Sequence, residues 1–283
     1  MKRQLFTCLF TTLLAGALLF QCTTEKKEVR LRLKFPPQQV LYWNVDYKKH
    51  TSVYEDDSLV VNEDKNMSHV SREEVVEIID SVKARLKLTS FYEYEKPDKD
   101  DSTKKVKVTD TSIVFYVQDD RGVNHDLTLE GKNDSALVEY NLRLYEQLAP
   151  RYPDQPISAG YTWSNSVKVM LKNGEINDAT TTYRFKAFVR EAGYDCAVVE
   201  FKGNTIVPYN HTYECGAQDI RIDRRQYEGA FYLAYREGII IRDEERYTFE
   251  AEGMRIKEGR QIDLKIKSEG SYSYYLTKAE GTL

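Results

Sequence analysis

Apolar and polar residues alternate along most of this chain. In residues 261–267, for example, Ile262, Leu264 and Ile266 alternate with charged or polar neighbours. A period of two residues places one face of a strand in a core and the other in solvent, which is typical of antiparallel sheets. Strand-like runs of this kind cover residues 29–33, 39–48, 112–118, 123–130, 161–171, 178–191, 194–201, 227–235, 239–249, 260–267 and 271–277.

Short polar segments containing glycine separate the predicted strands. They predict turns at residues 119–122, 172–174, 192–193, 202–204, 236–238, 252–253 and 268–270. Glycine supplies the backbone freedom that such turns need. The strands follow one another too closely for crossover helices between them, so neighbouring strands are expected to pair antiparallel.

Two segments have helical features. Residues 71–88 begin with a Ser-x-x-Glu capping box, but five β-branched residues between Val75 and Val82 favour strands. We therefore interpret this segment as two strands with a turn at Asp80 and Ser81, a helix being the alternative. Residues 135–149 carry an apolar stripe at helical spacing and are followed by prolines, which predicts a helix.

Together these patterns predict an all-β, mostly antiparallel fold. We expect about a dozen strands in a curved meander, forming a half-barrel or a sandwich with one short helix. Such a sheet must curl or fold over to cover its apolar face. The prediction is a single β domain over residues 29–283. Its two halves would be residues 29–133 and 151–283, joined by the helix at 135–149.

The amino terminus has the form of a secretory signal. Lys2 and Arg3 precede an uncharged stretch over residues 5–20, which is too short to span a bilayer comfortably. We predict a signal peptide over residues 1–21 and a tether over 22–28. A small-residue site at Ala15–Ala17 is an alternative point of cleavage, and it would leave Cys22 as a free thiol.

Leu19-Phe20-Gln21-Cys22 resembles a bacterial lipobox. That resemblance implies that Cys22 carries a diacylglycerol and further acyl chains such as palmitate. It also implies attachment to a membrane of the bacterial envelope, facing the periplasm or the cell surface. Thr23, rather than Asp, follows the cysteine, which by the sorting pattern of such lipoproteins points to the outer membrane.

The remaining cysteines form an even pair. Cys8 belongs to the predicted signal and Cys22 to the lipid anchor, which leaves Cys196 and Cys215 in an oxidising compartment. We predict a disulfide between them, two buried thiols being the alternative. The bridge requires the strand after the predicted turn at 202–204 to break, because a disulfide spans only about 7 Å between Cα atoms.

Charge and motifs bear on the kind of function. A net charge of −4 gives no electrostatic reason to expect a nucleic-acid partner. The four histidines do not fall at zinc-ligand spacing, and the glycine-rich and nucleophile motifs of common enzymes do not occur. We therefore predict neither catalytic activity nor a metal or cofactor.

Aromatic residues offer a candidate ligand site. The chain contains 21 tyrosines, and aromatic side chains on the concave face of a curled sheet would suit an acyl or amphipathic ligand. The predicted lining residues are Trp43, Trp163, Tyr183, Phe185 and Tyr232. The alternative is that these residues fill a solid core, as their β propensity also predicts.

The segment Pro153-x-x-Pro156, continued by Gly160-x-x-Trp163, adds a family resemblance. With the lipobox and the meander, it resembles uncharacterised secreted lipoprotein domains of bacteria. These are similar in outline to half-barrel lipoprotein carriers of the Lol type. The resemblance implies an anchored, non-enzymatic protein that binds a hydrophobic or amphipathic molecule. The alternative is an accessory lipoprotein that docks another envelope protein through its outer surface.

Overall fold

The computed structural model describes residues 27–97, 105–130, 152–170, 176–213 and 215–281. These residues form strands and contain no helix. Accordingly, no membrane-crossing helix is found in this part of the chain. The strands are β1 (Glu28–Val29), β2 (Val40–Glu55), β3 (Ser58–Ile78), β4 (Lys83–Pro97), β5 (Lys105–Asp119), β6 (Asn124–Leu129), β7 (Ile157–Ser158), β8 (Thr162–Met170), β9 (Ile176–Glu191), β10 (Tyr194–Thr212), β11 (Gln218–Ala234), β12 (Ile239–Lys257) and β13 (Arg260–Glu280).

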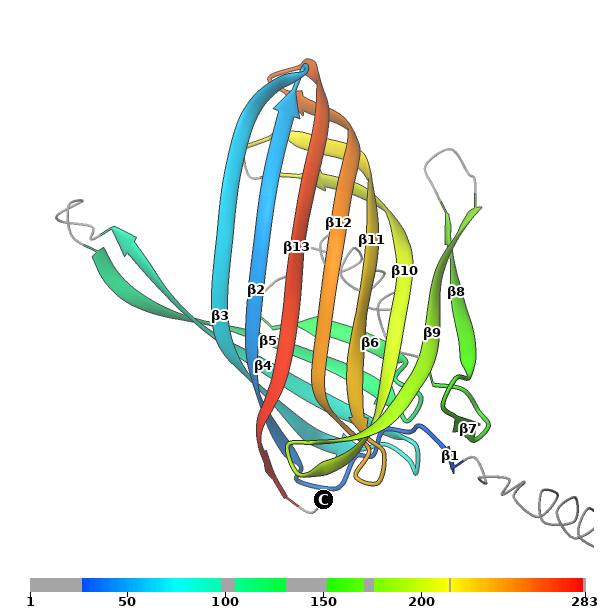
Figure 1. The fold of residues 1–283 in the computed structure, drawn as a ribbon. Coiled ribbons are helices and arrows are strands. Elements are labelled where there is room, and N and C mark those ends of the chain that lie inside the picture. Colours follow the sequence, from blue (N-terminus) through cyan, green and yellow to red (C-terminus); the bar gives the residue numbers. More distant parts are fainter. Residues whose placement is uncertain (1–26, 98–104, 131–151, 171–175, 214, 282–283) are drawn as a thin grey trace, which may run out of the picture.

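One antiparallel sheet of 11 strands makes up nearly all of the structure. Its order is β6-β5-β4-β3-β2-β13-β12-β11-β10-β9-β8, so the sheet is a meander in which the last strand pairs with the first long one. The outermost strands β6 and β8 do not pair with each other, which leaves the sheet open. Figure 1 shows the long central strands curving together, with β4, β5 and β6 crossing behind their lower ends.

The antiparallel, all-β prediction is confirmed. The segment 71–88 forms two strands, since β3 ends at Ile78 and β4 begins at Lys83. The hairpin predicted at 119–122 joins β5 to β6, where Asp119 accepts hydrogen bonds from the backbone N–H groups of Arg121 and Val123. The helix predicted at 135–149, the turn predicted at 172–174, the signal peptide and Cys22 all lie outside the described residues.

Three predicted turns are wrong. The chain continues as strand through 202–204 in β10, 252–253 in β12 and 268–270 in β13. A Cβ on Gly203 would lie 2.9 Å from Tyr227 Oη, and a Cβ on Gly270 would lie 2.7 Å from Tyr247 Oη. These glycines therefore make room for a tyrosine of the neighbouring strand rather than ending their own strand.

The predicted disulfide is also wrong, because both Cys196 and Cys215 are free. Cys196 lies near the beginning of β10, and Cys215 follows the end of that strand. The strand does not break at Pro208, which pairs with Ile222. The strand from Cys196 to its end at Thr212 covers about 16 steps of about 3.3 Å, roughly 50 Å along the strand, so the two cysteines lie at opposite ends of β10.

A solid core covers one end of the sheet. We call the covered side the inner face: there Leu31, Leu33, Tyr152 and Ile157 pack on β9, β10 and β11. Phe185, Val199, Phe231 and Leu233 are buried beneath them. The short β1–β7 pair brings these covering segments together, with Val29 opposite Ile157.

Paired charges occupy the inner face at the opposite end of the long strands. Arg255 bonds Asp219 at 2.8 Å and Glu55 at 2.5 Å, while Arg221 bonds Asp223 at 2.8 Å. Asp219 and Asp223 are almost completely buried. Each buried carboxylate therefore has a guanidinium partner, which offsets the cost of removing it from water.

Candidate functional site

A cavity of about 470 Å³ lies on the inner face beside the solid core, since Asp243 in its lining pairs with Phe231 of the core. Its floor is formed by the inward residues of β12, β13, β2, β3 and β4. The segment from Leu33 to Gln39 and the side chain of Tyr152 line it as well. The cavity is large enough to hold a small organic molecule.

Strand register places one row of side chains across the cavity floor. Asp243 pairs with Tyr274, Tyr274 with Val45, Val45 with His69, and His69 with Tyr92. Neighbouring strands lie about 4.8 Å apart, so Asp243 and His69 are separated by about 14 Å along the row. The floor thus has a polar group toward each side and an apolar stretch between them.

Stacked tyrosines form one wall of the cavity. The rings of Tyr47 and Tyr272 are 4.7 Å apart, Tyr247 stacks on Tyr272 at 5.5 Å, and the Tyr247 hydroxyl donates a hydrogen bond to Tyr47 Oη at 3.4 Å. The Arg225 guanidinium lies 4.3 Å from the centre of the Tyr247 ring and forms an ion pair with Glu245. This arrangement restricts the rotation of the rings, because each is packed against its neighbours.

Three buried polar atoms along the cavity have no hydrogen-bond partner. They are Gln39 Nε2, His69 Nδ1 and Tyr152 Oη. Gln39 is 4% exposed and Tyr152 is 1% exposed. A buried polar group without a partner costs on the order of 1–3 kcal/mol. A ligand with polar groups would satisfy these atoms and recover that cost.

Asp243, Glu73 and His69 of the cavity lining are held toward their neutral forms. Burial, with smaller contributions from Glu245 and Glu244, raises the pKa of Asp243 to about 7. Burial also raises the pKa of Glu73, although a 2.5 Å hydrogen bond from Tyr116 acts in the opposite direction. Desolvation lowers the pKa of His69. These shifts are what a poorly hydrated cavity produces.

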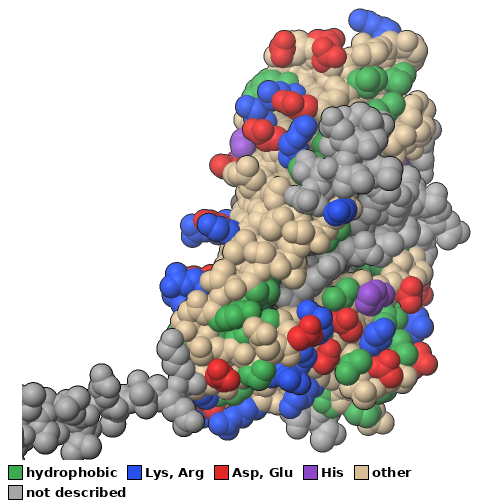
Figure 2. All heavy atoms as spheres, turned by 90° about the vertical axis from the view of Figure 1, so that its right-hand side faces the viewer, with side chains coloured by type: hydrophobic (Ala, Val, Ile, Leu, Met, Phe, Trp, Pro, Cys, Tyr) green, Lys and Arg blue, Asp and Glu red, His purple; other side chains and the backbone are tan. Residues whose placement is uncertain are grey.

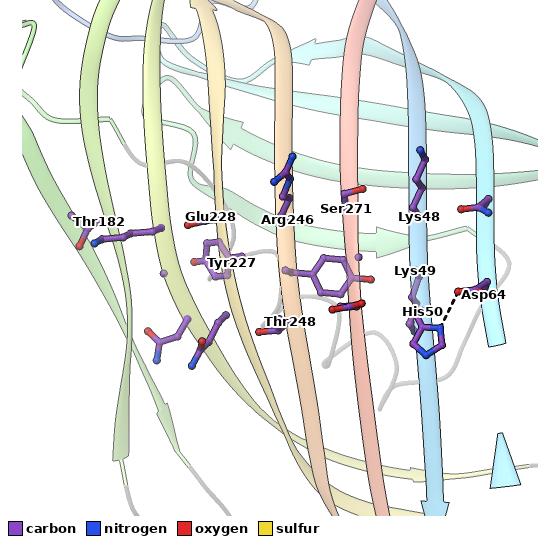
Figure 3. A pocket seen from close by; sticks show the side chains of 18 of the residues that line it. Lys48, Lys49, His50, Asp64, Thr182, Tyr227, Glu228, Arg246, Thr248 and Ser271 are labelled. Atoms are coloured by element: carbon purple, nitrogen blue, oxygen red, sulfur yellow. Dashed lines mark hydrogen bonds and ion pairs between the residues drawn. The ribbon is translucent and has the colours of Figure 1, made fainter. Parts of the chain in front are cut away.

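A second hollow, of about 1040 Å³, lies along the outer face and is more open to solvent. Figure 3 shows its side chains on neighbouring strands, including Lys48, Arg246 and Glu228. The contact drawn there is the 2.9 Å pair of His50 with Asp64. None of the described residues that line this outer groove has a buried polar atom without a partner. The inner cavity is therefore the stronger candidate site.

The structure places only part of the predicted lining at the cavity. Trp43 lines it, but Trp163, Tyr183 and Phe185 belong to the solid core, where the rings of Trp163 and Tyr183 stack at 5.3 Å. The Arg242 guanidinium lies 5.1 Å from the centre of the Tyr232 ring, and Tyr232 does not line the cavity. These four residues lie outside the lining of this cavity, and their role in ligand binding stays a prediction.

Sequence analysis missed the polar residues of the cavity. Asp243 follows Ile239 and Ile241 at two-residue spacing, and both isoleucines are buried. A charged residue in the phase of a buried face was therefore a usable signal. Gln39, His69 and Tyr152 carry no comparable signal, because their positions depend on contacts between distant strands.

Comparison with known proteins adds no further evidence on function. No model of a known protein family matches the chain, and no curated protein matches it either. The functional inference therefore rests on the geometry and chemistry of the cavity.

Proposed function

We propose that this protein is an envelope-anchored lipoprotein that binds an amphipathic small molecule in the inner cavity without transforming it. The observation that carries the proposal is the combination of aromatic walls with unpaired buried polar atoms. Trp43, Tyr47 and Tyr272 supply apolar surface, while Gln39 and Tyr152 require hydrogen-bond partners. An amphipathic molecule meets both demands at once.

The hydroxyl groups in the cavity support binding rather than covalent catalysis. Ser71 lies two residues after His69 on β3 and faces the same side of the sheet, yet its hydroxyl is hydrogen-bonded to Ser90 at 2.9 Å. A nucleophilic serine is instead activated by a hydrogen bond to a base. Asp243 and His69, the groups suited to proton transfer, lie at separate strands across the floor.

Native mass spectrometry of the protein purified from a bacterial envelope tests binding. We expect a bound molecule that is released on denaturation. A Val45→Phe variant fills the cavity floor and should lose the molecule, whereas Val70→Phe, on the exposed outer face of the neighbouring strand, should retain it. A wild-type protein with no bound molecule, and no uptake of added amphipaths, would contradict the proposal.

The proposed lipid anchor is tested by metabolic labelling with an alkyne analogue of palmitate. The wild-type chain should take up the label, and a Cys22→Ser variant should not. Cys8→Ser is the matched control, because it removes a cysteine from the predicted signal and should leave labelling unchanged. Label that persists in Cys22→Ser would show that the acyl chain is attached elsewhere or that the label is not specific.

A second candidate function is docking to another envelope protein. The end of β3 and the turn that follows it expose Val76, Ile78, Ile79 and Val82, each by more than two fifths of its surface. On the face drawn in Figure 2, by contrast, hydrophobic and charged side chains alternate in small groups. Capture of one defined protein by a photo-crosslinker at Ile79, and not at Thr248 in the outer groove, would favour docking.

A further inference from the structure

Asp243 has an unusual position among the acidic residues of the inner face. Glu245, two residues further along β12 and on the same face, forms an ion pair with Arg225. The inward neighbours of Asp243 are instead Phe231 on β11 and Tyr274 on β13. Within the described part of the chain, its side chain forms neither an ion pair nor a hydrogen bond.

The other charged groups that line the cavity leave this carboxylate uncompensated. The ammonium group of Lys34 donates a hydrogen bond to the backbone carbonyl of Arg236, and the Glu73 carboxylate accepts one from the Tyr116 hydroxyl. Desolvation holds the pKa of His69 below its ordinary value, which favours the neutral imidazole. The described lining therefore has negative character and supplies no cation to Asp243.

Aromatic rings and a buried hydroxyl surround the same region. Trp43, Tyr272 and Tyr274 line the cavity with Asp243, and their π faces attract a cation. Tyr152 Oη is buried and unpartnered, and the neighbouring Asp243 carboxylate adds to the effect of burial in raising the pKa of that hydroxyl. Gln39 Nε2 is a second buried atom without a partner. The site is thus more than a single acidic side chain.

We infer that the ligand of the cavity carries a protonated amine on an apolar body, with the ammonium paired to Asp243. The inference rests on the proposed function and specifies its ligand class. An ammonium supplies the missing partner of the carboxylate, and its N–H groups also reach acceptors such as Tyr152 Oη. A fatty acid places a second carboxylate beside Asp243, and that like-charge contact is unfavourable.

Trp43 provides the readout for a direct test. The chain has two tryptophans, so a Trp163→Phe variant leaves Trp43 as the reporter inside the cavity. This variant is titrated at about pH 8 with octylamine, 1-octanol and octanoate, which share one apolar chain. We expect octylamine to bind at least about ten-fold more tightly than octanol, and octanoate to bind most weakly.

Two further substitutions separate the role of Asp243 from general effects of charge. In the same background, Asp243→Asn should weaken octylamine binding about ten-fold and leave octanol binding within about two-fold. Retained octanol binding shows that the variant is folded. Glu244→Gln removes the same charge from the adjacent outward residue, where Glu244 bonds Arg242 and Tyr275, and should leave octylamine binding unchanged.

The possible failures are distinguishable. If octanol binds as tightly as octylamine, or if octanoate binds best, the amine inference is overturned and the binding function stands. If Asp243→Asn and Glu244→Gln have equal effects, the carboxylate of Asp243 is not the partner. If all three amphipaths leave Trp43 fluorescence unchanged, both the amine inference and the proposed binding function fail.

Discussion

Two neighbouring acids on one strand show how local surroundings decide the state of a carboxylate. Asp243 and Glu245 are both inward residues of β12, and burial raises the pKa of each. Arg225 lowers the pKa of Glu245 through charge and a hydrogen bond, but it does not act in this way on Asp243. A shift in strand register by two residues would exchange these surroundings.

Asp243 should therefore make the stability of the unliganded protein depend on pH. Its pKa is about 7 in the folded state and about 4 in an unfolded chain, so its protonated form stabilises the fold below about pH 4. This stabilisation is lost as the pH rises through 7. The titratable groups around it are Glu244 and Glu245 on the same strand, the latter paired with Arg225, and Tyr274 and Tyr152 from other segments.

Urea unfolding of wild type and Asp243→Asn at pH 5 and pH 8 measures this effect. The difference in the free energy of unfolding, Asp243→Asn minus wild type, should be more positive at pH 8 than at pH 5 by up to about 3 kcal/mol. Glu244→Gln is the control on the outer face. A relative stability of Asp243→Asn that is equal at both pH values would show that Asp243 titrates normally.

At the scale of the strand, glycine was the main source of error in sequence-based prediction. Glycines mark true turns at Gly193 and Gly238, where the backbone φ is +88° and +73°. Gly203, Gly253 and Gly270 instead lie inside strands that continue on both sides. Local sequence does not separate the two cases, because the need for glycine inside a strand comes from a side chain on the neighbouring strand.

Gly270→Val should consequently destabilise the sheet, although valine is a residue that favours strands. A Cβ at this position would lie 2.4 Å from the carbonyl oxygen of Lys48 and 2.7 Å from Tyr247 Oη, so the backbone or the ring must move. We expect a loss of about 1–3 kcal/mol in the free energy of unfolding, as in other overpacked sites.

Ser271→Ala is the matched control for Gly270→Val. Ser271 lies next to Gly270 on the same strand and lines the outer groove, and its substitution should change stability by less than about 0.5 kcal/mol. Thermal or urea unfolding measures both variants. A Gly270→Val protein as stable as wild type would show that the close approach of Tyr247 is not a constraint.

For the whole molecule, the pairing of β13 with β2 is the feature that local sequence does not predict. Alternation and turn residues predict strands that pair with their chain neighbours, and most pairs in the sheet are of this kind. The β2–β13 pair instead joins strands at opposite ends of the chain, with Tyr47 opposite Tyr272. The cavity lies across this junction, so its lining was predictable only in part, through Trp43.

This junction predicts that the two halves of the chain unfold together. Trp43 lies in the first half and Trp163 in the second, and β2–β13 pairing extends over 16 residue pairs from Leu264 opposite Glu55 to Glu280 opposite Val40. In Trp163→Phe and in Trp43→Phe, each with one remaining tryptophan, fluorescence should report the same urea midpoint as far-UV circular dichroism of that variant. Coincident transitions are the mark of two-state unfolding. Separate fluorescence and dichroism midpoints would instead mean that residues 29–133 and 151–283 are independent units, and a cavity built across β2 and β13 would then open whenever either unit unfolds.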